Sequence, residues 1–381
     1  MKRVYYIIIL SIILISCEKT ILLFQSQNFI KYFGSGYESK GFDVIQISDG
    51  YVFTGYDKGS NNDYQTLVCK VDNNGNINWT TLWGNSSRDE GKIIKSVTDG
   101  FLVAGTTYDG STTHSFLLKL NSAGDTIWSK KYGGQNSNFI VNDILLTQDK
   151  IYLAGQYDSL KTNNYQYYFS ELKYNDGSFL RDRYNLQPGF SSKFTKGFIQ
   201  SEEIILIGNK SDATENQISL TTFNQISLNP TVDHILSDVN LQSSDAIYRN
   251  DKLYVQVNEM NGTTKNLKVL KLNPATSFQE EWSTDAVPEV EGKTLVLKED
   301  GSLLVCGDQV NGIDSKIYFI TVSPDGVAGK SDEFRTFSGY AGKAIETYDK
   351  GVIMVGTTSP ASNGTMIQLI KTDMDYFMFK K

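Results

Sequence analysis

Five lysines recur at a similar distance before an apolar run that usually ends in glycine. Each lies 12–15 residues before the last residue of its run; they are Lys40, Lys92, Lys196, Lys293 and Lys343. An ammonium group donates three hydrogen bonds, so lysines that converge can bind an anion such as a uronate, a sialylated glycan or a phosphate. Alternatively, they are solvated residues at strand ends, where lysine discourages edge-to-edge pairing. Acidic residues that would reduce a positive field lie close by: Glu38, Asp89, Glu90 and Glu291.

Tyrosines form a second group of candidate binding residues. They fall in or beside predicted loops, at Tyr37, Tyr56, Tyr64, Tyr108, Tyr157 and Tyr165. Aromatic faces stack on sugar rings and anchor protein interfaces, so these positions favour a glycan or a protein as the ligand.

No catalytic or metal-binding motif is evident. The two histidines, His114 and His234, are too few for a histidine-rich metal site, and no cofactor is expected. The turn from Asp72 to Trp79 is similar to the sialidase Asp box, but its aspartate and tryptophan are each one residue too far from Gly75. The same turn lacks the closing glutamate of a calcium loop. A glycosidase would still need two converging carboxylates, which sequence alone cannot locate.

The N-terminus has the features of a lipoprotein signal peptide. Lys2 and Arg3 precede a twelve-residue apolar stretch, Val4–Ile15, which is too short for a permanent membrane span. The stretch ends in Leu-Ile-Ser-Cys, which looks like a lipobox. We therefore expect a signal peptide over residues 1–16 and lipidation of Cys17. A short tether over 17–21 and an exported domain over 22–381 would follow.

Composition and charge narrow the possible partners. The formal net charge is −7, and loss of the signal peptide would make it about −9. No run of basic residues is present, so nucleic acid is not an expected partner. The two remaining cysteines, Cys69 and Cys306, lie in apolar runs and are expected to be buried.

The apolar runs themselves repeat seven times at intervals of about fifty residues. Their last residues are Gly55, Gly105, Gly155, Gly208, Val257, Gly307 and Gly356. Each of the first six copies contains four strand-like segments, and turns rich in Asn, Asp and Gly precede the fourth segment in several of them. Seven such copies predict an all-β fold, a seven-bladed β-propeller of four-stranded antiparallel blades.

The last copy lacks its fourth strand, because the chain ends soon after the third. The segment from Asn28 to Gly34 is similar to the strand that ends at Gly84. We therefore expect this N-terminal strand to complete the last blade and close the ring.

The repeat resembles one that is common in envelope proteins of Bacteroidota. That repeat runs roughly Y-G-G, then D-G-G-Y with apolar residues and a glycine, then K-x-D-x-x-G and a tryptophan. Residues 83–133 match it best, and the resemblance extends over about 22–373. It implies a propeller in the cell envelope, and it implies no reaction.

Three functions are open. The first is a non-enzymatic binding or scaffold protein for a glycan or a protein, held to a membrane by lipid. The second is an enzyme that acts on polysaccharide or peptide, and the third is a structural subunit of an envelope assembly. The outer membrane is the expected location, with the periplasmic or outward orientation left open.

Overall fold

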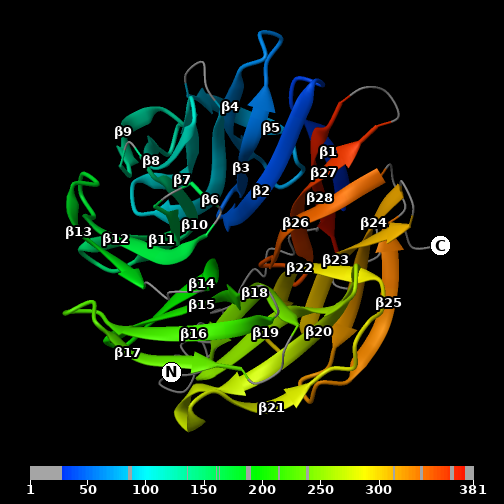
Figure 1. Cartoon of the computed structure of the whole chain (residues 1–381). Coiled ribbons are helices and arrows are strands. Elements are labelled where there is room, and N and C mark those ends of the chain that lie inside the picture. The colour runs from blue at the N-terminus through cyan, green and yellow to red at the C-terminus, as the bar shows by residue number, and fades with distance from the viewer. Residues whose placement is uncertain are drawn as a thin grey trace, which may run out of the picture.

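A computed structural model describes residues 28–373, apart from 85–87, 135, 160, 163, 186–189, 213–214, 237–239, 312–313, 335–337 and 361–363. Cys17 and the predicted signal peptide and tether therefore lie outside the described residues. Within them, strands form seven four-stranded antiparallel sheets arranged around a central axis (Figure 1). The only helix of this part is the 3-10 turn Pro274–Thr276, and none is suited to crossing a membrane.

Each sheet is one blade, and its first strand lies nearest the axis. Blade 1 contains β2 (Glu38–Ile47), β3 (Gly50–Lys58), β4 (Tyr64–Val71) and β5 (Ile77–Trp83). Blade 2 contains β6 (Asp89–Val97), β7 (Gly100–Asp109), β8 (Thr112–Asn121) and β9 (Thr126–Tyr132). Blade 3 contains β10 (Asn138–Leu146), β11 (Lys150–Asp158), β12 (Gln166–Lys173) and β13 (Phe179–Asn185).

The remaining blades repeat this order. Blade 4 contains β14 (Ser191–Gln200), β15 (Glu203–Ser211), β16 (Asn216–Asn224) and β17 (Pro230–Ile235). Blade 5 contains β18 (Leu241–Arg249), β19 (Lys252–Asn261), β20 (Thr264–Asn273) and β21 (Gln279–Ser283). Blade 6 contains β22 (Val290–Leu297), β23 (Leu303–Asn311), β24 (Asp314–Val322) and β25 (Ala328–Phe334). Blade 7 contains β26 (Ser338–Glu346), β27 (Val352–Ser359), β28 (Met366–Thr372) and, from the other end of the chain, β1 (Phe29–Phe33).

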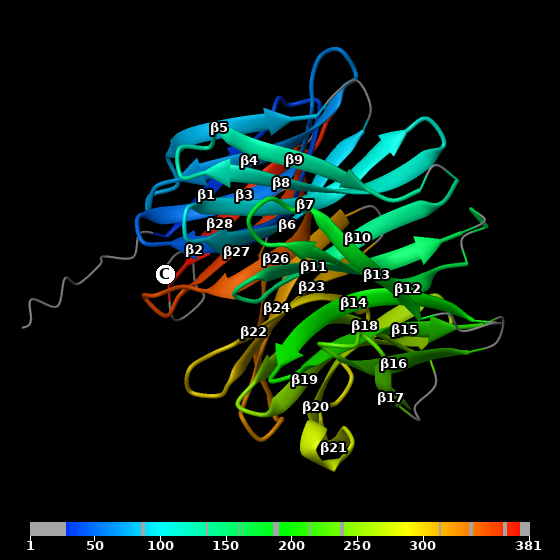
Figure 2. The same cartoon turned by 90° about the vertical axis from the view of Figure 1, so that its left-hand side faces the viewer.

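The ring is closed by β1, as the sequence predicts. This strand pairs antiparallel with β28, from Phe29 opposite Lys371 to Phe33 opposite Ile367. Phe29 and Phe33 are buried in a cluster that also contains Tyr51 and Phe53 of blade 1. The N-terminal strand thus completes blade 7 and contributes to its packing against blade 1 (Figures 1 and 2).

The glycine and the tryptophan of the repeat pack against each other across blade boundaries. Gly124, in the turn before β9, has a φ of +88°, and a Cβ atom there would lie 2.7 Å from the indole of Trp79 in β5. The same indole donates a hydrogen bond to the carbonyl oxygen of Ser122 at 3.2 Å. Only glycine tolerates both the backbone angle and the close approach. The turn motif is therefore an interblade packing device.

Candidate functional site

Every inner strand contains a β-bulge at its fourth or fifth residue. At each bulge one extra residue interrupts the register with the second strand, as between Gly41 and Asp43 in blade 1 and between Gly91 and Ile93 in blade 2. The same irregularity occurs in the other five blades. A bulge re-aims the side chains beside it. Here the seven bulges bring two or three consecutive residues of most blades to the axis.

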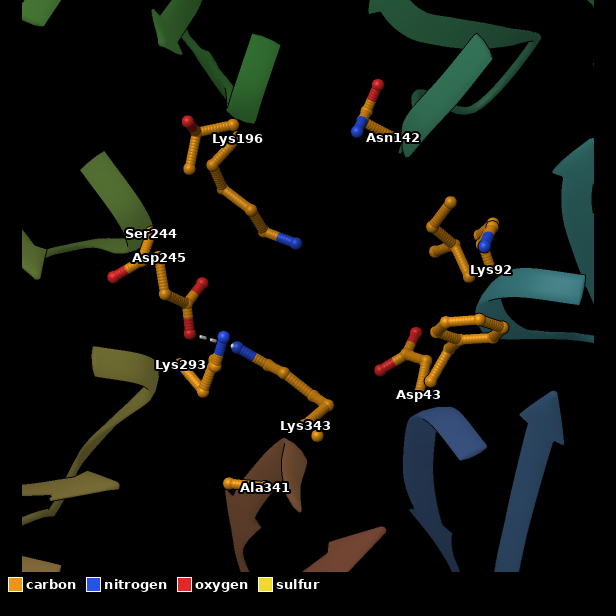
Figure 3. Close-up of a pocket in the computed structure, with 13 residues that line it drawn as sticks. Asp43, Lys92, Asn142, Lys196, Ser244, Asp245, Lys293, Ala341 and Lys343 are labelled. Atoms are coloured by element: carbon orange, nitrogen blue, oxygen red, sulfur yellow. Dashed lines mark hydrogen bonds and ion pairs between the residues drawn. The ribbon is translucent and has the colours of Figure 1, made fainter. Parts of the chain in front are cut away.

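These residues line a cavity of about 240 Å³ on the axis (Figure 3). The lining residues come from all seven blades: Phe42, Asp43, Lys92, Ile93, Asn142, Thr195, Lys196, Ser244, Asp245, Lys293, Ala341, Gly342 and Lys343. Four of the five lysines singled out in the sequence are among them. The side chains of Lys196 and Lys343 extend into this space (Figure 3).

Lys40, the fifth lysine, does not line this cavity. It lies two residues before the bulge of blade 1, is exposed, and places its ammonium group 5.3 Å from the ring centre of Phe42. It stands 15 residues before Gly55, whereas Lys92 stands 13 residues before Gly105. Two residues along a strand move a side chain by about 7 Å, which is enough to take Lys40 out of the ring.

Three aspartates directly after the bulges join neighbouring blades. In blade 1, Asp43 accepts hydrogen bonds from the amide of Val44 at 3.0 Å and from that of Ile94, in blade 2, at 2.9 Å. Asp143 accepts from Ile144 and from Gly197 of blade 4. Asp245 accepts from Ala246 and from Leu295 of blade 6. Each carboxylate is therefore fixed by backbone donors on both sides of a blade boundary.

Each of the four lysines in the cavity is paired with a carboxylate. Lys196 Nζ lies 3.1 Å from Asp143, and Lys343 Nζ lies 2.6 Å from Asp245 (Figure 3). Lys293 pairs with Glu291 at 2.8 Å. Lys92 pairs with Glu90 and also lies over the Phe42 ring at 3.7 Å. The repulsion among the lysines is thus offset by carboxylates of the protein itself.

The charges of this site are set by burial and by neighbouring ions together. Burial alone would lower the pKa of Lys196. The attraction of three nearby carboxylates, those of Asp143, Asp245 and Asp43, is larger than this effect and raises the pKa. Burial raises the pKa of Asp143 and of Asp245, but their lysine partners hold both below the usual value. For Asp43 burial prevails over the more distant lysines and its pKa is raised. Among the described residues, no lysine lies within ion-pair distance of Asp43.

A second row of polar side chains bridges blades 4 to 7. Asn209 accepts a hydrogen bond from the amide of Ser243, and Asn258 accepts one from the amide of Gly292. Asp308 takes the equivalent position in blade 6 and accepts from the amide of Ala341 at 2.6 Å. Burial raises the pKa of Asp308 to about 6, although the Ala341 amide and Lys293 counteract it.

The candidate tyrosines do not form one open platform. Tyr56 is buried, and Tyr108, Tyr157 and Tyr165 are partly buried. Tyr157 packs against Phe139 and Tyr184, with ring centres 4.9 and 4.8 Å apart. Tyr37 is 56% exposed. The structure therefore uses most of these rings for packing, and it does not bring them to the cavity.

The three aspartates beside the bulges were not among the residues singled out in the sequence. Their signal is a constant spacing, because Asp43, Asp143 and Asp245 each lie 12 residues before the last residue of the apolar run. The described residues hold no group of three or more His, Cys, Asp or Glu side chains arranged to bind a metal ion. Cys69 and Cys306 are buried and free.

Comparison with known proteins supports the fold. No family model and no curated protein sequence matches the chain. Among solved structures, the chain is similar to the Dos1 propeller, with a TM-score of 0.54 and 9% identity over 91% of this chain and 95% of that one. It is also similar to a europium-containing methanol dehydrogenase, with a TM-score of 0.55 and 10% identity over 87% of this chain and 81% of that one. At this level of identity the likeness establishes a β-propeller and nothing about its activity.

Proposed function

We propose that this protein is an exported lipoprotein whose propeller acts as a non-enzymatic binding module of the cell envelope. The observation that carries the binding role is the axial cavity, where seven bulges bring ammonium and carboxylate groups from separate blades into about 240 Å³. A closed ring that holds such groups on separate strands, bridged by hydrogen bonds between blades, suits recognition of a small polar ligand or of a charged group on a larger one.

The location follows from the sequence of residues 1–17. A basic start, a short apolar stretch and a small residue before Cys17 are the features that lipoprotein processing requires. Several acyl chains on the new N-terminus would bind a membrane far more firmly than one chain does. The membrane contact is therefore assigned to lipid, with the outer membrane as the proposed site.

Metabolic labelling tests the anchor. Cells that express the protein are grown with a radiolabelled fatty acid, and the wild type is compared with Cys17→Ser. The wild type should carry the label and partition into the detergent phase, and the variant should lose the label and enter the aqueous phase. Equal labelling of both proteins would refute the anchor. Cys69→Ser serves as the control, because that thiol is buried in blade 1.

A further inference from the structure

We propose that the axial cavity is a binding site for a small anion, a carboxylate or a phosphate on a ligand no larger than a single sugar ring, held by Lys196 and Lys343. This inference deepens the proposed function and rests on it, because it names the ligand class of the binding module.

The balance of donors and acceptors in the cavity favours an anion. Each ammonium group has three N–H donors. Within the described residues, Lys196 is paired with Asp143, and Lys343 with Asp245. Two donors of each lysine are therefore left for a ligand or water. The aspartate oxygens, in contrast, already accept backbone amides of two blades. The cavity thus offers more donors than acceptors, and oxygen atoms of an anion match it.

Asn142 lines the cavity opposite Lys343 and carries no charge (Figure 3). Its side-chain oxygen is buried and accepts no hydrogen bond from any described group. A negative charge introduced at this position would therefore oppose the binding of an anion by the lysines.

The size of the cavity limits the ligand. Its volume of about 240 Å³ is below the range of roughly 300–1,000 Å³ that is common for drug-sized ligands. A single sugar ring is of the right size, and an internal segment of a polysaccharide is too large. Lysine binds as a point charge, so it does not discriminate strongly between a carboxylate and a phosphate on such a ring.

Calorimetry on the full-length mature lipoprotein in non-ionic detergent tests the site. Galacturonate, glucose 6-phosphate and neutral galactose are titrated separately. Saturable binding of either anion, with none for galactose, is the expected result, and the tighter of the two anions shows whether the site prefers a carboxylate or a phosphate. Affinity should fall as salt rises from about 0.05 to 0.5 M, since the Debye length shrinks several-fold.

Variants locate the binding. Lys196→Gln and Lys343→Gln should each weaken binding at least about tenfold, the equivalent of ~1.4 kcal/mol. Lys40→Gln is the matched control and should bind within about twofold of the wild type, because this lysine is outside the cavity. Asn142→Asp should also abolish anion binding by adding a negative charge. It breaks no hydrogen bond of its side-chain oxygen, so it remains informative if a lysine variant fails to fold.

Two results would overturn the site. One is the absence of saturable heat with either anion at about 10 mM, a concentration that detects millimolar affinities. The other is unchanged binding in the folded variants of Lys196, Lys343 and Asn142. Neither result depends on the fatty-acid labelling, so failure of the anion site and failure of the lipid anchor are separate outcomes.

Discussion

Asp43 and Asp245 offer a comparison of two carboxylates in equivalent positions. Both follow a bulge and accept amide hydrogen bonds within and across a blade boundary. Only Asp245 also contacts a lysine, Lys343, at 2.6 Å. Asp245 also accepts a hydrogen bond from the hydroxyl of Thr294 at 3.1 Å. The two residues therefore separate the contribution of these side-chain partners from that of the backbone bridges.

Substitution of these two aspartates by asparagine should have unequal effects. Asp245→Asn leaves Lys343 without its partner and should lower the free energy of unfolding by about 2 kcal/mol, less than for a fully buried pair because Lys343 is partly exposed. Asp43→Asn removes a buried charge that lacks a close partner, so it should be neutral or stabilising. Urea unfolding at neutral pH measures both, and equal losses would contradict the role assigned to the ion pair.

Asp308 should make stability depend on pH in a defined direction. Burial raises its pKa to about 6, above about 3.9 in the unfolded chain. The folded state therefore binds the proton more tightly, and this contribution to stability is present below about pH 4 and is lost as pH rises through about 6. The lowered pKa values of Asp143 and Asp245 act in the opposite direction, below the range in which Asp308 titrates.

Asp308→Asn isolates this contribution. Asparagine already bridges blades at the equivalent positions 209 and 258, so the bond from the Ala341 amide can be kept. The stability of the variant relative to the wild type should rise between about pH 4 and 7, by on the order of 2 kcal/mol. Thermal unfolding across that range provides the measurement. A constant difference would show that Asp308 has an ordinary pKa.

The lysines of the cavity and two of their partners, Glu90 and Glu291, could be predicted from the sequence, and the partners of Lys196 and Lys343 could not. A charged residue that recurs at one point of a repeat is visible in a single sequence, as at Lys92 and Lys343. Asp143 and Asp245 act through backbone amides of the next blade, about fifty residues away. Such contacts depend on how the blades pack, which no local pattern records.

At the scale of elements, the strands are set by two kinds of local pattern. Apolar runs that usually end in glycine predicted the second strands, and turn residues such as those at 72–75 marked the start of the outer ones. The bulges were not predicted, because one extra residue in a strand changes neither its composition nor its length noticeably. The bulge fixes which residue reaches the axis. Without it, the sequence analysis could not distinguish Lys40, which lies outside the cavity, from Lys92, which lines it.

The strand β1 permits a test of ring closure. Deletion of residues 22–33 should unfold or strongly destabilise the whole propeller, because β28 would become an open edge and Phe29 and Phe33 would leave the core. Each buried phenylalanine is worth about 3–5 kcal/mol. Deletion of residues 22–27 alone keeps β1 and is the control. A melting temperature equal to that of the wild type after the longer deletion would show that β1 is dispensable.

At the scale of the whole molecule, the disc has two different faces. One face carries the turns between first and second strands and between third and fourth strands, and we call it the turn face. Acidic residues are exposed there, among them Asp49, Asp99 and Glu299. The opposite face, the loop face, carries the connections between second and third strands and the connections between blades, from which the inner strands begin (Figure 2).

The start of β1 lies on the turn face. Phe29 pairs with Lys371, which contacts Asp349 in the turn between the first and second strands of blade 7. A lipid on Cys17 would therefore attach the disc to the membrane from the turn face. The residues between Cys17 and Phe29 span at most roughly 40 Å. The loop face should point away from the membrane.

Fluorescence transfer to a membrane dye tests this orientation. Ser111 and Ala123 are exposed and lie just beyond the two ends of β8, Ser111 on the loop face and Ala123 on the turn face. Each is changed to cysteine, labelled with a donor dye, and the lipoprotein is placed in vesicles that contain an acceptor on the headgroup. Ten residues of strand separate the sites by about 33 Å, so transfer should be clearly stronger from position 123. The native thiols at 69 and 306 are buried and should not react. Equal transfer from both sites would mean that the disc has no fixed orientation, and stronger transfer from position 111 would place the loop face, and not the turn face, against the membrane.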